Sequence, residues 1–295
     1  MKARHKHAAG HWAGLLLLVA ALLCFAVLDT TTKRVTEVVP PLMAVWVLFV
    51  VQAIASTTFV WKRRGLASLK TEHLGLQIAR GSLLLAVQLL AFFSLMYLPV
   101  GEFTAMAMTT PLLVTLFAAR FLGEHVSLVR LLLVGGGLVG TLVIVRPGSG
   151  AFGWATLLPM GLVAFNTVYQ LLTSRMARTE DAVSTLVYTS VTAVTWVTLL
   201  LPWVWTPVTD PMMWLGLLLM GVAASGGNLL FILAFERAPA ATLMPYMYLQ
   251  IGFGILGGWL VFDHVPDGIA LVGMALVAAC GVAGGLLTMH ERARL

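Results

Sequence analysis

The chain has 295 residues, of which 60% are hydrophobic and only 10% are charged, and its formal net charge is +6. A soluble domain carries roughly 25% charged residues, so this composition excludes a cytosolic enzyme and a protein that binds nucleic acid. Ten membrane spans of about 20 residues would occupy about 200 positions, leaving too little chain for a sizeable soluble domain. We therefore expect the whole chain to be embedded in a lipid bilayer.

Ten apolar segments follow one another along the chain. They cover approximately residues 12–33, 41–61, 76–98, 102–122, 127–145, 153–173, 182–205, 212–235, 239–262 and 267–288. Each is long enough to cross a bilayer as a helix, and helices are required because hydrocarbon cannot satisfy backbone polar groups. The sequence therefore predicts an all-α membrane protein with ten transmembrane helices and short tails at 1–11 and 289–295.

The positive charges are distributed unevenly between the two sides of this topology. If the N-terminus is cytoplasmic, fifteen of the 18 Lys and Arg residues lie on the cytoplasmic side, and the exceptions are Lys33, Arg34 and Arg146. Short loops with this bias orient a membrane protein. We expect both termini to be cytoplasmic.

The two halves of the chain match weakly when one is shifted by about 140 residues. The matched pairs are Phe25 and Phe165, Gly81 and Gly221, Gln88 and Asn228, and Pro99 and Pro239. Because each half holds five spans, the halves must be inserted in opposite orientations. Inverted repeats are typical of secondary transporters, with the substrate site at the repeat interface. We expect repeats at 12–146 and 151–288.

Several motifs occur in the same order as in a known family. They are Leu98-Pro99-Val100-Gly101-Glu102, Thr110-Pro111-Leu112-Leu113-Val114 and Ile144-Val145-Arg146-Pro147-Gly148, then Pro245-Tyr246-Met247-Tyr248-Leu249-Gln250-Ile251 and Asp263-His264-Val265-Pro266-Asp267. Over nearly its whole length the chain resembles the EamA repeats of the drug/metabolite transporter superfamily. The resemblance implies ten helices, alternating access around a central cavity, and the bacterial inner membrane. Members of that family export amino acids, drugs and other metabolites, and some import riboflavin or S-adenosylmethionine.

Amides and aromatic rings within apolar spans are the candidate substrate-binding residues. They are Gln88, Asn228, Asn166, Tyr169, Gln170, Tyr246, Tyr248, Gln250, Trp46 and Trp196. An amide in a span must face the bundle interior, and aromatic rings with amides suit an apolar substrate with polar ends. The alternative for each is packing: a hydrogen bond between helices or a buried ring whose polar atom is satisfied.

A second group is expected to act in gating. Asp29 and Lys33 lie four residues apart on one helix face, so they can form an ion pair that anchors the helix or an outer gate that contacts a substrate amine. Trp259 lies near the outer end of its helix and completes the gate.

Two prolines are expected to disrupt spans. Pro111 and Pro245 each remove a backbone hydrogen bond, and the hydroxyl of Thr110 can bond back to the backbone. Each proline is either a fixed kink or a flexible point for rocking.

Other residues are expected to be structural. Arg80 and Glu102 lie near span ends and should reach the interface by snorkelling. Three glycine pairs have the spacing that allows helices to approach closely, within one half or between the halves. They are Gly136 and Gly140, Gly254 and Gly258, and Gly281 and Gly285. The chain is compatible with a monomer or a homodimer, and the cysteines Cys24 and Cys280 should be packing residues.

These features predict a secondary transporter with no catalytic residue, cofactor or metal. The leading hypothesis is export or facilitated diffusion of aromatic or other large neutral amino acids by alternating access. The alternatives are an importer of metabolites such as riboflavin or S-adenosylmethionine, and a multidrug exporter. A membrane-embedded enzyme is a rival of another class, but the predicted topology places His125 and His264 on opposite sides. No acid lies near the midplane, so transport is either uncoupled or coupled through an off-centre group such as Asp29.

Overall fold

A computed structural model describes residues 2–65, 69–122, 128–146, 153–176, 180, 182–238 and 243–292. Every regular element in these residues is helical, which confirms the all-α prediction. Nine helices of the described chain are long and apolar enough to cross a membrane, and Val100–Val114 is a shorter apolar segment. His125, Pro147, Gly148 and Pro239 lie outside the described residues.

The helices begin and end close to the bounds that the apolar segments predict. The first half contains α1 (Lys2–Thr36), α2 (Pro41–Arg64), α3 (Leu74–Tyr97), α4 (Val100–Ala107), α5 (Thr110–Leu122) and α6 (Leu128–Val145). The second half contains the 3₁₀ turn η2 (Gly153–Thr156), α7 (Leu157–Met176), α8 (Ala182–Leu200), η3 (Leu201–Trp203), α9 (Pro211–Arg237), η4 (Met244–Tyr248), α11 (Leu249–Phe262) and α12 (Gly268–Arg292).

The fourth and ninth predicted spans are interrupted rather than continuous. In the fourth, α4 ends at Ala107 and α5 begins at Thr110, so Pro111 lies in the first turn of a new helix, where its missing N–H is not needed. The turn is held by a hydrogen bond of 2.6 Å between the hydroxyls of Thr109 and Thr141. Pro245 lies similarly in η4, directly before α11. Both prolines therefore lie at the start of a helical segment instead of inside a continuous span, and their flexing stays a prediction.

The chain forms two compact units, each of which draws on both halves of the sequence. Unit 1 comprises Met1–Thr30, Pro99–Gly153 and Gly226–Leu295, and unit 2 comprises Thr31–Leu98 and Trp154–Ser225. The unit boundaries fall within α1 and α9. The predicted repeats at 12–146 and 151–288 describe the order of the spans, and they stay a prediction.

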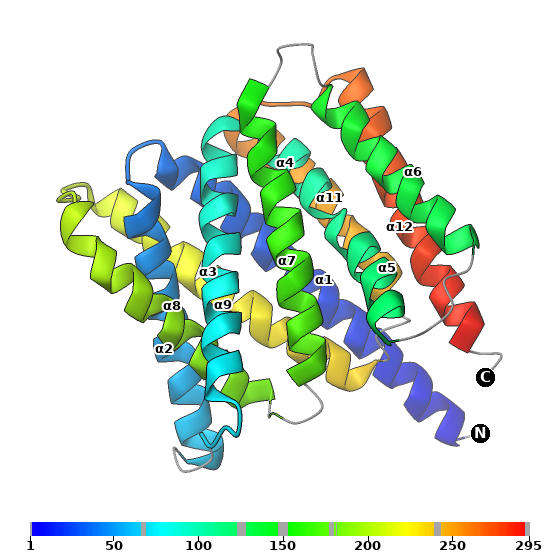
Figure 1. Cartoon of the computed structure of the whole chain (residues 1–295), viewed down its shortest axis with the longest axis horizontal. Helices are drawn as coiled ribbons and strands as arrows, with labels where there is room; N and C mark the ends of the chain where they lie inside the picture. Colours follow the sequence, from blue (N-terminus) through cyan, green and yellow to red (C-terminus); the bar gives the residue numbers. More distant parts are fainter. Residues whose placement is uncertain are drawn as a thin grey trace. The chain divides into compact units, whose positions relative to one another are not determined.

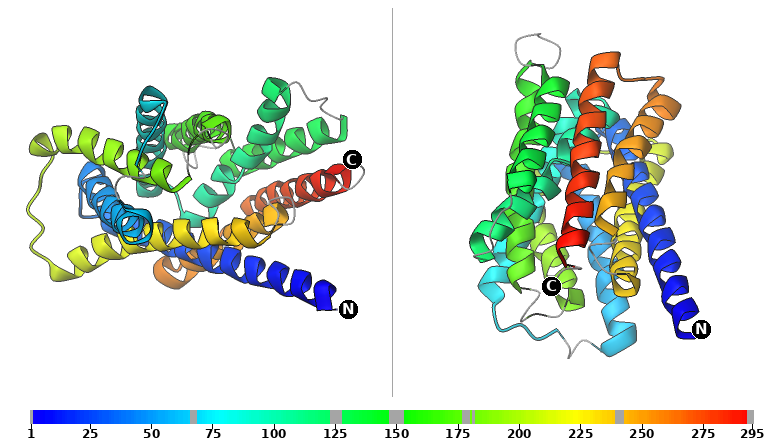
Figure 2. Two further views of the ribbon diagram at one scale, coloured as in Figure 1. Left: turned by 90° about the horizontal axis from the view of Figure 1, so that it is seen from below. Right: turned by 90° about the vertical axis from the view of Figure 1, so that its right-hand side faces the viewer.

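Unit 1 is held together by small residues at helix crossings. In Figure 1, α12 lies along α6 and α11 lies along α4, and Figure 2 shows α12 beside α6 from a second direction. A Cβ atom on Gly140 would lie 2.8 Å from the carbonyl oxygen of Gly273, and one on Gly136 would lie 2.7 Å from Cys280 Sγ. The prediction that Gly136 and Gly140 allow close approach is confirmed, here between the two halves.

Unit 2 is built from α3 packed against α7 and α8, with α2 against α8. Its contacts are also close, since a Cβ atom on Gly81 would lie 2.6 Å from Thr192 Cβ. Many large apolar side chains of both units remain exposed, among them Leu128, Trp203 and Leu260. Such exposure on long apolar helices is expected when lipid, not water, surrounds the protein.

Candidate functional site

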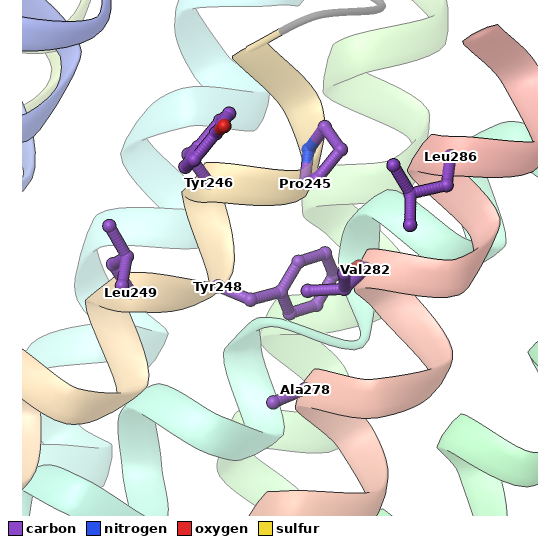
Figure 3. A pocket seen from close by; sticks show the side chains of 7 residues that line it. All are labelled: Pro245, Tyr246, Tyr248, Leu249, Ala278, Val282 and Leu286. Atoms are coloured by element: carbon purple, nitrogen blue, oxygen red, sulfur yellow. The ribbon is translucent and has the colours of Figure 1, made fainter.

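Unit 1 contains a cavity of about 420 Å³ between η4, the first turn of α11, and α12. Its lining residues are Pro245, Tyr246, Tyr248, Leu249, Ala278, Val282 and Leu286, and none of these seven is charged. Figure 3 shows Tyr248 directed toward α12, whereas Tyr246 and Leu249 lie on the side of the ribbon farther from α12. The cavity has the size and the largely apolar lining of small-molecule sites.

One wall of this cavity depends on two glycines of α12. A Cβ atom on Gly281 would overlap the ring of Tyr248, and one on Gly285 would lie 2.8 Å from Pro245 Cγ. The prediction of close approach at Gly281 and Gly285 is therefore confirmed, here within the second half. Tyr248 packs against α12 and is only 6% exposed, whereas the side chain of Tyr246 is 42% exposed.

Gln250 connects α11 to α1 inside unit 1. Its amide nitrogen faces the carbonyl oxygen of Leu22 at 2.8 Å, and its amide oxygen faces the backbone nitrogen of Ala26 at 3.3 Å. Its side chain also contacts the carboxyl group of Asp29. The structure thus brings together one residue predicted for substrate binding and one predicted for gating.

The structure places Arg80 inside unit 2, so the prediction that it snorkels is wrong. Arg80 is 4% exposed, and its guanidinium group lies 4.7 Å from the ring centroid of Tyr169 and donates to the Tyr169 hydroxyl at 2.6 Å. It also donates to Thr173 Oγ1 at 2.8 Å, to the carbonyl of Thr185 at 3.4 Å and to Thr189 Oγ1. The facing helices α7 and α8 offer hydroxyl groups, and these replace the water that the interface would supply.

Glu102 in unit 1 is also buried, so the prediction that it snorkels is wrong as well. Its side chain is 3% exposed, because α4 packs against α11. The proximity of a residue to a span end therefore does not decide whether its side chain turns outward.

Sequence reasoning missed Glu180, which lies between α7 and α8. Its carboxylate accepts hydrogen bonds from Thr71 Oγ1 at 2.9 Å, from the backbone nitrogens of Glu72 and His73 at 3.2 Å each, and from Gln77 Nε2 at 3.4 Å. Burial acts to raise the pKa of Glu180, but these hydrogen bonds together outweigh burial and lower it. Its position in a short loop before the start of α8 gives no signal that it stabilises the start of α3.

Three more predicted residues have definite partners in unit 2. Lys33 Nζ donates to the carbonyls of Leu95 and Leu98, at 3.0 and 2.9 Å, and so satisfies the end of α3. Trp46 Nε1 donates to Thr198 Oγ1 at 2.9 Å, and Trp196 Nε1 donates to Ser82 Oγ at 3.0 Å. These bonds fit the packing alternative for both tryptophans.

The other predicted residues lie in one unit or the other, and no shared site is described for them. Gln88, Asn166 and Gln170 are partly buried in unit 2, and Asn228 is partly buried in unit 1. Thr110 is buried and Trp259 is exposed, both in unit 1. Their roles stay predictions. Within the described residues, no group of three His, Cys, Asp or Glu side chains is placed to hold a metal ion.

Comparison with known proteins gives the family. The model of the EamA-like transporter family matches residues 12–146. This match covers slightly less than half of the chain. The resemblance predicted from the motifs of the first half is thus confirmed, and the chain is a multi-pass membrane protein similar to transporters, not to enzymes.

Its curated relatives are transporters of several metabolites. A riboflavin transporter of Brucella anthropi is 28% identical over 268 residues, which cover 88% of this chain and 94% of that protein. The pseudopaline exporter CntI of Pseudomonas aeruginosa is 25% identical and covers 91% of this chain and 94% of its own. An S-adenosylmethionine uptake transporter of Rickettsia conorii is 25% identical over 72% of each chain.

A solved crystal structure of a protein also resembles the chain. It has a TM-score of 0.68 and 20% sequence identity, and the likeness covers 95% of this chain and 99% of that one. This similarity shows the fold.

Proposed function

We propose that the chain is a secondary transporter of a neutral metabolite with a flat aromatic ring, for which riboflavin is the first candidate. The substrate class is inferred from the cavity beside η4, which is lined by two tyrosines and five apolar residues, none of them charged. A flat ring packs well against tyrosine, whose hydroxyl can still meet a polar edge of the substrate. The similar protein of Brucella anthropi is a riboflavin transporter.

The charged side chains of the described helices favour a neutral substrate over an amino acid. A zwitterion that leaves water needs partners for both of its charges. Lys33 and Arg80 already bind carbonyl and hydroxyl oxygens, and Glu102 lies beside His264. These contacts favour riboflavin over the amino acids that the sequence first predicts.

Aromatic or other large neutral amino acids are nevertheless the second candidate class. Asp29 lies beside Gln250 in unit 1, where a carboxylate and an amide together suit a substrate ammonium group.

For the transport cycle we infer two inverted five-helix repeats, 12–146 and 151–288, that alternate access to the two sides of the inner membrane. Spans at equal positions in the two halves pack on each other: α2 on α8, α4 on α11, and α6 on α12. Such pairing supports an approximate two-fold relation between the halves. The charge bias of the loops supports cytoplasmic termini.

Flux in proteoliposomes tests this proposal. Purified protein should accelerate the movement of riboflavin, followed by its fluorescence, down a concentration gradient. Unlabelled flavin should compete, while aromatic amino acids, S-adenosylmethionine and a cationic drug should compete weakly. If amino acids move and riboflavin does not, the second candidate class replaces the first. If none of these compounds moves in protein that is folded and correctly inserted, the proposed function is wrong.

A further inference from the structure

An acid and an imidazole meet in unit 1, and neither belongs to the residues that line the tyrosine cavity. Glu102 Oε1, in the first turn of α4, lies 3.1 Å from His264 Nε2 in the connection between α11 and α12. The two side chains differ in access, since 3% of the Glu102 side chain and 41% of the His264 side chain is exposed. The pair therefore links an enclosed carboxyl group to a more open imidazole.

The chain holds this pair in place through the end of α11. Asp263 adopts a left-handed conformation, with φ 51° and ψ 23°, and its backbone nitrogen donates to Trp259 O at 3.0 Å. The backbone nitrogen of His264 donates to Gly258 O at 3.1 Å. This left-handed cap ends the helix, and it turns the chain so that His264 meets the start of α4.

Close packing of α4 on α11 fixes the other side of the pair. A Cβ atom on Gly101 would lie 3.1 Å from Ile255 Cγ1, and one on Gly254 would lie 2.7 Å from Thr104 Oγ1. Glu102 follows Gly101 directly, so this close packing fixes the position of its backbone relative to α11.

The second oxygen of Glu102 is the unusual feature. Oε2 is buried, and no described residue gives it a hydrogen bond. A buried carboxylate with one unpaired oxygen is costly, because it has lost its water without full replacement. One proton relieves this cost, since it converts a carboxylate beside a neutral imidazole into a pair with no net charge.

Other charged groups at this end of unit 1 are paired with one another or lie outside the pair. The elements packed on α4 are α6, α11 and α12. Arg146, after α6, is ion-paired with Asp267, before α12, and the carboxylate of Asp267 also accepts from Ala270 N at 2.8 Å. Arg146 additionally interacts with Glu102 through space, and Asp263 is exposed on the cap itself. The charge of Arg146 therefore acts on both Asp267 and Glu102, and among the described residues His264 is the group that shares a hydrogen bond with Glu102.

We propose that Glu102 and His264 form a proton-binding site that couples substrate movement to the proton gradient, an inference that rests on the proposed transport function. A proton from water reaches the imidazole, is shared between Nε2 and the carboxyl oxygens, and returns to water in the same cycle. Only O–H and N–H bonds form and break. The pair takes the coupling role for which Asp29 was the sequence-based candidate.

Two measurements test the site, and the first does not depend on transport. In infrared spectra of the full chain in detergent, recorded over a range of pH, the protonated carboxyl band of wild type should contain a component that is lost in Glu102→Gln, remains in Asp29→Asn and is altered in His264→Gln. Glu37→Gln is the matched control, since Glu37 is exposed and paired with Arg34. If the band persists unchanged in Glu102→Gln, the proposed site is wrong.

The second measurement compares driven accumulation with exchange in proteoliposomes. With one proton per substrate, a gradient of one pH unit supports about tenfold accumulation, because one unit is worth about 1.4 kcal/mol. Wild type and Glu37→Gln should reach this level, whereas Glu102→Gln and His264→Gln should accumulate nothing yet still exchange labelled for unlabelled substrate.

Each outcome of the flux measurement tests either the proton site or the transport function. Retained exchange shows that a variant is folded and active. Driven accumulation that survives in Glu102→Gln, or that is lost only in Asp29→Asn, overturns the proton site while leaving the transporter intact. Absence of exchange in wild type counts against the transport function, and the infrared titration then still decides whether the pair binds a proton.

Discussion

The two units treat buried charge in different ways. In unit 2, Arg80 has hydrogen-bond partners on three of its nitrogens and an aromatic ring below it, and Glu180 accepts from side chains and backbone alike. In unit 1, Glu102 has one imidazole partner and an oxygen without a described donor, and an uncharged cavity lies open beside η4. A polar network whose charged members have many partners rigidifies the fold, although Gln77 Oε1 in unit 2 is buried without a described partner. The comparison indicates a supporting role for the polar network of unit 2 and binding roles for unit 1.

Removing the charge of Arg80 should have the largest effect on stability. Arg80→Met keeps much of the side-chain volume but leaves the hydroxyls of Tyr169, Thr173 and Thr189 without their donor. We expect a loss of about 3 kcal/mol, since several buried polar groups lose partners at about 1 kcal/mol or more each. Thermal unfolding in detergent measures it, with the exposed Arg34 changed to Met as the control. A loss no larger than that of the control would show that the network is not structural.

Adding one methyl group to α12 should test the cavity of unit 1. In Gly281→Ala the new Cβ atom would overlap the ring of Tyr248, which must leave its place in the wall. We expect about 1–3 kcal/mol of destabilisation from overpacking and a loss of riboflavin flux. Gly252→Ala is the matched control, because nothing lies within 4 Å of a Cβ atom at that position of α11. Equal flux in both variants would show that the cavity wall formed by Tyr248 is not needed for transport.

The contrast between the units also marks where sequence reasoning succeeds. Apolar length predicts the spans because the bilayer sets a minimum length, and Pro111 and Pro245 lie where spans break because proline cannot continue a helix. The small residues Gly136 and Gly281 do mark close crossings, as their spacing predicts. These features depend only on local chain properties.

The partners of Arg80, Glu102 and Glu180 could not be predicted in this way. Both Arg80 and Glu102 lie near span ends, a position equally suited to reaching the interface. The outcome depends on which helix packs alongside and whether it offers hydroxyls, as α7 and α8 do, or an imidazole held by the left-handed Asp263. Such contacts join residues far apart in sequence, and no local pattern encodes them.

The smallest expected effect is on stability at low pH, and it compares the buried carboxylate of Glu180 with the exposed carboxylate of Asp267. Hydrogen bonds keep the pKa of Glu180 below its ordinary value of 4.5 in spite of burial, and the hydrogen bond from Arg146 likewise lowers the pKa of Asp267. A carboxyl group whose pKa is lower in the folded state than in the unfolded state stabilises the fold above its ordinary pKa. That contribution is lost as the pH falls through the folded value. The contribution of these two carboxylates to stability should therefore be constant near neutrality and be lost below about pH 4.5.

Glu180→Gln should reduce both the stability at pH 7 and the slope of this decline. The oxygen that accepts from Gln77 Nε2 becomes an NH2 group, and the neutral amide oxygen is a weaker acceptor for the bonds from Thr71, Glu72 and His73. Asp267→Asn is the comparison in unit 1 and should change the curve less, since its side chain is well exposed and water and salt screen its bond to Arg146. Thermal unfolding between pH 3 and 7, at low and high salt, measures both variants. If Asp267→Asn flattens the curve more than Glu180→Gln, the better-satisfied charge lies in unit 1 and the assignment of supporting and binding roles must be reversed.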